Sequence, residues 1–531
     1  MLKRSISIAL AIVLVGLLVL QARSLFVFPV PDSIRWFGDE SWLMTESIST
    51  VKTGTVHHPH ALSSTLNAPK AFLPVGAAWL RTAVYGVPGY LLYPAHNPIH
   101  VGRVVTWLLS LLLIGVTYWI VRRRTGDNTS GLTAAVILAS TLSFFYSSHS
   151  SRPDLLKGLI ILMVAAWVSS EGFVTRQTPR KWFVVTLVSL ICAIWLPFHL
   201  YFHLISICGV AFLLYRGYRD RSAWMWILLG VFAALAITGI VQYTFSGELL
   251  LSGPEGHKAE FSDVTRDIPI LRLLSLSAQL SVLQRRFEML WTEAPLMFVL
   301  IPLAVYALWH YRRTISAHAT SRMLAFAIAA LLGWYFLQRI HPAYTIQILP
   351  LFIAASVIAF SRLRMSRTWS ALGIALVILS AVITAIQSIP ATANGRQWTE
   401  ENNKAVQALR SLVETNGAEK PLVMVEASAS MPLLSDTSIR LMTTHFQFFP
   451  IYDDSIGETI DRHDVDYCIL FNTANYGYDR NAIDPLVRTI KQRSDLIGVE
   501  AGDFFDISKD YFKRDESSLK ADTLFLYKLR K

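Results

Sequence analysis

The chain of 531 residues is 53% hydrophobic and only 16% charged, with a mean hydropathy of +0.42. This composition is too apolar for an ordinary soluble enzyme and is typical of a polytopic membrane protein. The net charge of +11 does not indicate nucleic-acid binding, because residues 396–531 hold 22 acidic and 17 basic residues, whereas the rest of the chain holds 15 and 31. No basic face interleaved with aromatic residues is present either.

Apolar stretches close to the ~20 residues needed to cross a bilayer recur along the first 390 residues. They lie at residues 5–20, 101–121, 131–147, 155–170, 182–198, 199–215, 223–245, 295–309, 323–338, 343–360 and 369–389. We therefore expect about eleven transmembrane helices in a polytopic α-helical membrane protein. A cleaved signal peptide is the alternative for residues 3–22, since the sequence VLQARS offers a processing site.

Basic residues gather in every second connection between these stretches. They are Lys3 and Arg4; Arg122, Arg123 and Arg124; Arg176, Arg180 and Lys181; Arg216, Arg219 and Arg221; Arg312, Arg313 and Arg322; Arg362, Arg364 and Arg367. Because Lys and Arg are retained on the cytoplasmic side, this alternation orients the chain in a plasma or inner membrane. The loops at 23–100 and 246–294 and everything after about residue 390 are then external.

The first external loop, residues 23–100, contains an acidic pair between aromatic residues in the sequence RWFGDESWLMTE. Residues 39–51 are predicted to form a helix on the membrane surface, with Asp39 as N-cap and Met44, Ile48 and Val51 on its apolar side.

A second segment of this loop, residues 67–86, is apolar but carries Lys70 and Arg81. These charges favour an interfacial or partly re-entrant helix over a span. Both side chains are also of the type that extends to lipid phosphates, and this is the favoured interpretation for Arg81.

After residue 395 the sequence alternates short apolar runs with helix-like segments. The predicted strands are 421–427, 465–471, 496–501 and 522–529, and the predicted helices are 400–417 and 484–494. Residues 391–531 are therefore expected to form a small external α/β domain that follows a transmembrane domain of residues 1–390. Cys468 is the single cysteine of this domain, so no disulfide forms within it.

Several features stand in a recognisable order along residues 1–390. They are the acidic pair Asp39-Glu40, the juxtamembrane segment around Lys70, Arg103 in VGRVVTWLLS, the RPDLL that begins at Arg152, and RIHPAYTIQILPLF near the end. This order resembles the C-type glycosyltransferases (GT-C fold), above all the group of protein mannosyltransferases and lipid A aminoarabinose transferases. The chain departs from the group in two places: it has Pro-Lys-Ala around Lys70 where Lys-Pro-Pro is frequent, and His-Pro-Ala-Tyr from His341 where His-Tyr-Leu-Leu-Pro is frequent.

The resemblance implies an inverting enzyme that takes a sugar from a polyprenyl phosphate on the external face. The acceptor is a hydroxyl of a lipid, a glycan or a protein. A carboxylate has to receive the hydroxyl proton and cations have to hold the charge that develops on the phosphate. The resemblance assigns Asp39 as the base and Glu40 as the residue that orients it, the acceptor or a divalent metal. Its candidates for substrate binding are Lys70, Arg103, Arg152, Asp154, Arg339, His341 and Tyr344.

Each candidate also has a structural interpretation. Asp39 is a good helix cap, and Asp154 stands where it would cap the span that begins at Leu155. Arg103, Arg152 and Arg339 lie where arginines anchor helices to lipid headgroups. The histidines of HHPH at 57–60 have metal-binding chemistry, although exposed histidines are more often solvated.

Two other functions remain open. A transporter of lipid-linked glycans shares the membrane setting, but the spans show almost no charged residues, with Gln242 and Gln347 as their obvious long polar side chains. Ion-coupled transport usually needs such groups near the midplane. A glycan ligase or polymerase uses the same kind of lipid donor but transfers a whole chain.

Overall fold

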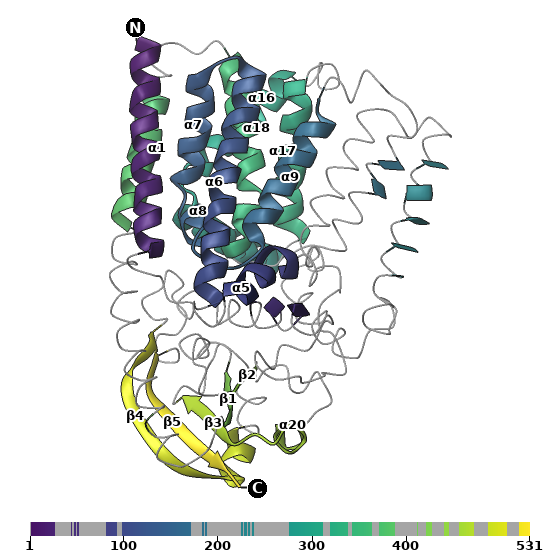
Figure 1. Ribbon diagram of the computed structural model, residues 1–531. Helices are drawn as coiled ribbons and strands as arrows, with labels where there is room; N and C mark the ends of the chain where they lie inside the picture. Colours follow the sequence, from purple (N-terminus) through teal and green to yellow (C-terminus); the bar gives the residue numbers. More distant parts are fainter. Residues whose placement is uncertain are drawn as a thin grey trace.

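The computed structural model describes two parts, a bundle of helices and a five-stranded sheet beyond one end of it (Figure 1). The described residues are 2–26, positions 44, 47, 48, 50 and 51, 81–92, 98–170, scattered positions of 183–187 and 225–240, 276–311, 319–337, 342–363, 371–387, 411, 421–426, 440–444, 456–471, 487–506 and 520–530. In Figure 1 the chain's N-terminus lies at the opposite end of the bundle from the sheet.

The bundle consists of long apolar helices and shorter segments at their ends. The long helices are α1 (Leu2–Phe26), α6 (Pro98–Thr125), α7 (Asn128–Ala139), α9 (Asp154–Val168), α15 (Leu276–Glu293), α16 (Met297–Tyr311), α17 (Ala319–Leu337) and α18 (Leu349–Arg362). The short segments are the π-helix η1 (Thr82–Gly86), α5 (Val87–Leu92), α8 (Leu142–Ser147) and the 3-10 helix η4 (Pro342–Gln347), and Ala371–Gln387 is also helical.

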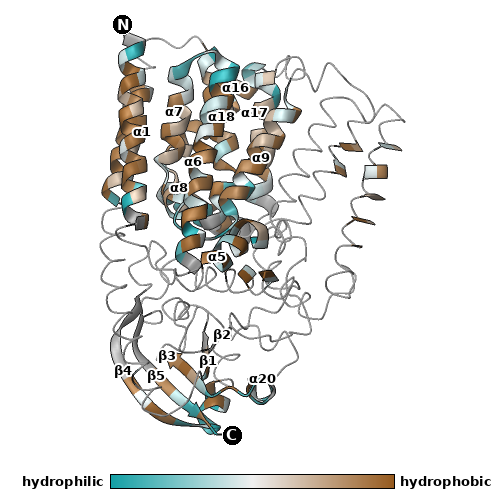
Figure 2. Cartoon of the chain, in the orientation of Figure 1, coloured by the Kyte–Doolittle hydropathy of each residue, from teal (hydrophilic) through white to brown (hydrophobic). Residues whose placement is uncertain are grey.

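Two of the described helices are long and apolar enough to cross a membrane, with their apolar windows at Arg4–Arg23 and His100–Thr125. A third span is possible by the same test if Val282–Glu293 and Met297–Tyr311, which meet at 110°, are taken together. Large apolar side chains such as Ile12 and Val19 are exposed along α1, which is coloured as hydrophobic over most of its length in Figure 2. Such a surface is suited to lipid.

Helices occupy the predicted spans 5–20, 101–121, 155–170, 295–309, 323–338 and 369–389. The predicted spans 182–198, 199–215 and 223–245 lie almost wholly outside the described residues, so the expected total of eleven remains a prediction.

The predicted span 131–147 is wrong as a single helix. It breaks after Ala139, and the extended backbone of Thr141 (φ −96°, ψ 137°) starts α8, with its hydroxyl accepting a hydrogen bond from the amide of Phe144. A threonine that caps a new helix in this way ends the old one.

The predicted span 343–360 begins as the 3-10 segment η4 and becomes α-helical only at Leu349. Pro350 has no N–H to donate to the carbonyl of Ile346, so an α-helix cannot run through this point without losing a bond. Gly158 of α9 packs against that same carbonyl: a Cβ at Gly158 would lie 2.9 Å from the Ile346 oxygen.

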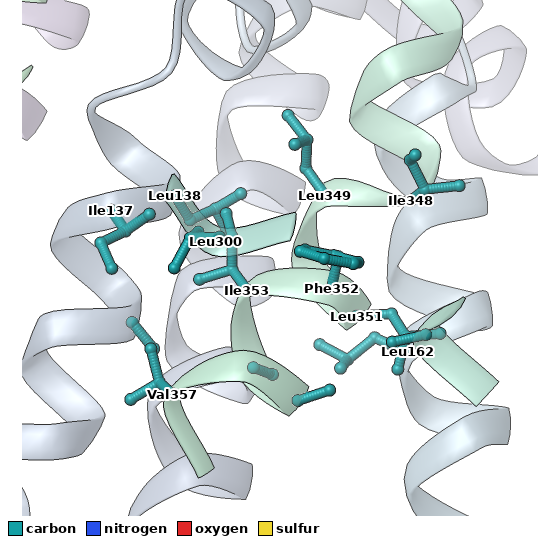
Figure 3. Close-up of a cluster of buried hydrophobic side chains, with 14 of the residues drawn as sticks. Ile137, Leu138, Leu162, Leu300, Ile348, Leu349, Leu351, Phe352, Ile353 and Val357 are labelled. Atoms are coloured by element: carbon teal, nitrogen blue, oxygen red, sulfur yellow. The ribbon is translucent and has the colours of Figure 1, made fainter. Parts of the chain in front are cut away.

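The hydrophobic core of the bundle is organised around α18, in which every residue from Leu349 to Ala359 is buried. Figure 3 shows Phe352 and Ile353 of this helix among Leu138 of α7, Leu162 of α9 and Leu300 of α16. A helix that is apolar on all sides is a central helix, and α18 thus fixes the positions of its neighbours.

The C-terminal sheet has the strand order β2-β1-β3-β5-β4. Its elements are β1 (Leu422–Glu426), β2 (Arg440–Thr444), α20 (Ile456–His463), β3 (Tyr467–Phe471), β4 (Ser494–Asp506) and β5 (Lys520–Leu529). Strand β1 pairs in parallel with β2 and β3, whereas β5 runs antiparallel to both β3 and β4. The four predicted strands are confirmed.

Two elements of this domain were not predicted. The sequence of β2, RLMTT, lacks a long apolar run, and α20 is short. The predicted helix 484–494 is helical in its described part up to Gln492 but ends where β4 begins, and the predicted helix 400–417 lies outside the described residues apart from Ser411. Cys468 is buried on β3 as a free thiol, and burial raises its pKa.

The contact between α9 and η4 predicts a steric effect at Gly158. Gly158→Ala should lower the free energy of unfolding by about 1–3 kcal/mol, because the new methyl group meets a backbone carbonyl that cannot rotate away. Gly115→Ala on α6 is the matched control, since no described atom beyond the helix's own backbone and the two neighbouring residues lies within 4 Å of its added Cβ. Thermal unfolding of the purified variants in detergent compares the two, and equal melting temperatures would contradict the close packing.

Candidate functional site

A buried carboxylate, Asp154, stands at the first residue of α9 and is only 2% exposed. Its Oδ2 accepts a hydrogen bond from Arg152 Nε at 3.0 Å. Its Oδ1 accepts from Lys157 Nζ at 3.0 Å and from Gln347 Nε2 at 2.8 Å. The carboxylate therefore ties together the turn before α9, the first turn of α9 and the end of η4.

The local geometry of two helices explains this arrangement. Asp154 and Lys157 are three residues apart on α9 and so share one face. Tyr344 and Gln347 are three residues apart on a 3-10 helix, where such side chains eclipse each other. Accordingly, the Lys157 ammonium bonds Asp154 and also lies 5.8 Å from the centre of the Tyr344 ring, a cation–π distance.

The segment before α6 packs directly against this cluster. The Tyr85 hydroxyl of η1 donates to the carbonyl oxygen of Arg152 at 3.2 Å, and Thr106 of α6 donates to the same hydroxyl at 3.5 Å. A Cβ at Gly102 would lie 2.7 Å from the Ser151 Cβ. The start of α6, and with it the next residue Arg103, is thus held beside the turn that leads to Asp154.

The short helix around Met44 packs against α5 and the start of α6, next to the turn that leads to Asp154. Met44 and Ile48 are buried, and their side chains lie against the positions of Gly89 and Gly102. The prediction that this apolar side lies on the membrane surface is therefore wrong at these residues, because α5 and α6 offer it a protein surface. The adjoining Asp39 and Glu40 lie outside the described residues.

Four cationic side chains are buried at this end of the bundle: Arg81, Arg103, Arg152 and Lys157. Arg81 is close enough for its charge to act on Lys157, so the favoured interpretation of Arg81 as a lipid-facing side chain is wrong. Arg103 is 2% exposed, which is incompatible with a headgroup anchor. Buried cations are costly unless anions compensate them, and such a cluster is suited to bind a phosphate.

A fifth buried cation, Arg286, comes from α15, which contacts both η4 and α8. Its guanidinium lies 4.2 Å from the centre of the Trp334 ring, a cation–π contact that does not neutralise charge. Glu293, the last residue of α15, is fully buried as well. The sequence did not single out either residue, since both lie in a predicted external loop.

The structure brings together three of the predicted site residues, Arg152, Asp154 and Tyr344, and holds Arg103 beside them. The capping interpretation of Asp154 is wrong, because Pro153 is the N-cap and the carboxylate is bonded by side chains. The anchor interpretation of Arg152 is wrong, because its side chain is buried against Asp154. The remaining candidates lie outside the described residues: Asp39, Glu40, Lys70, Arg339 and His341.

Lys157 was also missed, although its sequence signal is simple. An acid and a lysine three residues apart, as in DLLK, form an ion pair on a helix, and a lysine within a long apolar run calls for such a partner. The apolar run was recognised as a span, but its lysine was not recognised as a buried charge.

The described residues do not form a metal centre. No three His, Cys, Asp or Glu side chains come together in the described part of the chain. Both oxygens of Asp154 are occupied by N–H donors, which leaves it poorly suited as a metal ligand. The HHPH sequence at 57–60 lies outside the described residues.

Three features together define the fold class of this protein: a helical bundle, a buried polar cluster at one end of it, and a small sheet domain beyond that end. The protein has the fold of the C-type membrane glycosyltransferases. The chain is similar to ArnT, the lipid A aminoarabinose transferase, from Cupriavidus metallidurans, with 14% identity over 97% of both chains: the TM-score is 0.53 for the apo state and 0.55 for ArnT bound to undecaprenyl phosphate. No family model and no curated protein matches the sequence.

A more distant similarity is to the apo form of an oligosaccharyltransferase from Archaeoglobus fulgidus. It has 12% identity and a TM-score of 0.43, and covers 88% of this chain and 70% of the other. This similarity is too weak to support an argument. The match to ArnT confirms the polytopic fold class that the sequence resemblance implied.

The bonding of Asp154 predicts a large and specific loss of stability. Asp154→Asn should lower the free energy of unfolding by about 3–5 kcal/mol, because it leaves Arg152 and Lys157 buried without their carboxylate. The double variant Asp154→Leu with Lys157→Met should recover part of this loss, since it removes two opposite charges together. Folded yield by size-exclusion chromatography and the melting temperature report both effects, and a stable single variant would show that the carboxylate is not needed for charge balance.

Proposed function

We propose that this protein is a membrane glycosyltransferase that moves a sugar from a polyprenyl-phosphate donor to an acceptor hydroxyl. The observation that carries the proposal is the buried cluster of cations around Asp154, at one end of a fold shared with ArnT, a protein whose structure holds undecaprenyl phosphate. A lipid phosphate at a helical bundle needs buried cations of this kind.

The reaction forms a bond between the acceptor oxygen and the anomeric carbon and breaks the bond from that carbon to the phosphate oxygen. The electron pair of the broken bond passes to the polyprenyl phosphate, whose negative charge grows. We assign Arg103 and Arg286, both buried, to meet that charge, with Lys157 adding to the positive field from its position beside Asp154. Fixed cations in a buried site favour the transition state because they need no reorganisation.

The acceptor hydroxyl must lose its proton, and we assign this proton to Asp39. The assignment rests on the sequence order. Asp154 is the poorer candidate, because it accepts hydrogen bonds from three N–H donors, two of them on cationic side chains that favour the ionised carboxylate. Met44, which follows Glu40 by four residues in the sequence, packs against Gly102 of α6, and this supports the proposal that the acidic pair acts near Arg103. Glu40 is proposed to orient Asp39 or the acceptor, or to hold a divalent metal.

A transporter of lipid-linked glycans is the second candidate, and the Asp154–Lys157 pair favours it, because buried ion pairs occur in ion-coupled transport. A ligase or polymerase is the third. Release of polyprenyl phosphate from a labelled donor in detergent separates the enzymes from a transporter, since no gradient exists there. The mass of the product then distinguishes transfer of one sugar from transfer of a whole chain.

Variants of the acidic pair and of the phosphate ligands test the chemistry with this assay. Asp39→Asn should reduce transfer by roughly two orders of magnitude or more with little change in melting temperature, because Asn caps a helix as well as Asp but accepts no proton. Arg103→Gln should weaken donor binding by about 1.5–3 kcal/mol, the range for a charge-assisted hydrogen bond. Arg123→Gln at the far end of the bundle, where the side chain is exposed, is the control.

Two results would contradict the proposed transferase mechanism. One is full transfer activity in both Asp39→Asn and Glu40→Gln. The other is an equal, small effect of Arg103→Gln and Arg123→Gln on donor affinity. A defect of Glu40→Gln that added divalent metal restores would assign Glu40 as a metal ligand, and an unresponsive defect would assign it to positioning.

We also propose that the cluster end of the bundle and the C-terminal domain are external. Gln492→Cys in this domain should react with an impermeant thiol reagent on intact cells, whereas Asn128→Cys, next to the basic end of α6, should react only after lysis. Both positions are exposed. The background carries Cys192→Ala and Cys208→Ala, while Cys468 can stay because burial raises the pKa of its thiol. The reverse labelling pattern would invert the topology.

A further inference from the structure

A second polar site lies at the end of the bundle opposite to Asp154. It is a cavity of about 420 Å³ between the ends of α6, α16, α17 and α18. The lining residues are Arg124, Thr125, Tyr311, Thr320, Ser321, Ser361 and Arg362. The lining contains two arginines, four serine or threonine hydroxyls and one tyrosine. None of the described acidic residues lines the cavity. Its chemistry is therefore that of an anion site.

Two hydroxyl groups in this cavity have no hydrogen-bond partner within the described structure: those of Thr320 and Ser321. Thr320 is 4% exposed and Ser321 is fully buried. A buried hydroxyl without a partner is destabilising, because it has lost its hydrogen bonds to water and gained none in return. Two of them side by side on one cavity wall point to a ligand that accepts their hydrogen bonds.

These hydroxyls belong to the first turn of α17, which begins at Ala319 and runs for 19 residues. The backbone N–H groups of a first turn have no partner within their own helix, and the helix dipole places partial positive charge there. The partial charge of this helix end and the two hydroxyls therefore favour the same anion.

The neighbouring arginines are positioned by bonds to the helix ends. Arg124 Nη2 donates to the carbonyl oxygen of Ala166 at 3.0 Å, and Arg362 Nη2 donates to the carbonyl oxygen of Arg124 at 3.4 Å. The nearest acid in sequence, Asp127, is occupied elsewhere, because its carboxylate accepts from the amide and hydroxyl of Ser130 at the start of α7. Asp127 does not line the cavity.

The level of the cavity along the bundle indicates the source of the anion. Trp119 of α6 and Trp309 of α16 are 54% and 64% exposed and lie within two helical turns of the cavity residues on the same helices. Exposed tryptophans near helix ends mark the boundary between hydrocarbon and headgroups. At that depth the abundant anion is the phosphate of a phospholipid.

We propose that this cavity binds the phosphate of an anionic phospholipid headgroup in the leaflet opposite to the glycosyl-donor cluster. The bound phosphate bridges the first turn of α17 to Arg124 of α6 and Arg362 of α18. The lipid thus holds together helix ends whose loops are rich in like charges. This site is separate from the donor site and does not depend on the proposed transferase activity.

The test compares the full-length protein in nanodiscs of phosphatidylcholine alone and of phosphatidylcholine with phosphatidylglycerol. Phosphatidylglycerol should raise the melting temperature, and native mass spectrometry should find it retained. Arg362→Gln should lower the retained phosphatidylglycerol on the order of tenfold, the effect of losing one charged hydrogen bond. Arg123→Gln is the matched control, because it removes the same charge from the same end of the bundle. The Arg123 side chain stacks on Trp119 outside the cavity, so this variant should retain the lipid.

Thr320→Val gives a readout that a purely structural hydroxyl would not. Because this hydroxyl has no hydrogen-bond partner among the described residues, the variant should melt no lower than the wild type in phosphatidylcholine, yet respond less to phosphatidylglycerol. Equal lipid retention in Arg362→Gln, Arg123→Gln and wild type would overturn the proposal, as would equal losses in both variants, which would indicate diffuse attraction. A shift produced by inorganic phosphate in phosphatidylcholine nanodiscs, with none from phosphatidylglycerol, would overturn the lipid as the occupant and assign the site to a soluble phosphate.

Discussion

The cost of burying charge in an apolar bundle constrains this structure more than any other interaction. Asp154 is surrounded by three N–H donors, from Arg152, Lys157 and Gln347. Each donor lies on a different segment, and none can move away without leaving a buried charge or amide unsatisfied. Since Gln347 is on η4 and Arg152 is bound through its carbonyl to Tyr85, the carboxylate also fixes the parts of the chain that precede α6 and α18. The cluster can therefore serve as a rigid frame for substrate groups.

The parts of the fold that the sequence predicted are those governed by local rules. Spans such as α1, α6 and α9 follow from apolar length, because no other structure satisfies the backbone in lipid. The breaks at Thr141 and Pro350 were not predicted from apolar length, since it does not register a capping threonine or a missing N–H. In the sheet, β1, β3 and β5 are buried runs, whereas β2 has a sequence, RLMTT, that becomes a strand only by pairing with β1. Its formation depends on a tertiary contact and not on propensity.

For the candidate site, the sequence predicted residue types better than residue roles. The resemblance placed Arg152, Asp154 and Tyr344 at one site, and they do lie together. The bonds of Asp154 to Arg152 and Lys157 are local, and the DLLK pattern indicates the second of them. Its bond to Gln347, which is 193 residues further along the chain, appears in no local pattern. The burial of Arg286 was not predicted for a related reason. It depends on a contact with Trp334, and the pattern of an amphipathic helix does not show which other helix its faces will pack against.

The two ends of α9 show how one helix supports charge at both sides of the bundle. Its first residue is the acid Asp154, and at its last turn Arg322 donates from Nε and Nη2 to the carbonyl oxygen of Ser169. An acid at the N-terminus and cations at the C-terminus both match the helix dipole. Arg322 is fully buried, whereas Arg122 and Arg123 at the same end are exposed. Basic residues at this end of the bundle therefore also hold helix ends. The buried Arg322 bonds the carbonyl oxygen of Ser169 at the end of α9, and the exposed Arg362 of α18 donates to the carbonyl oxygen of Arg124 in the last turn of α6.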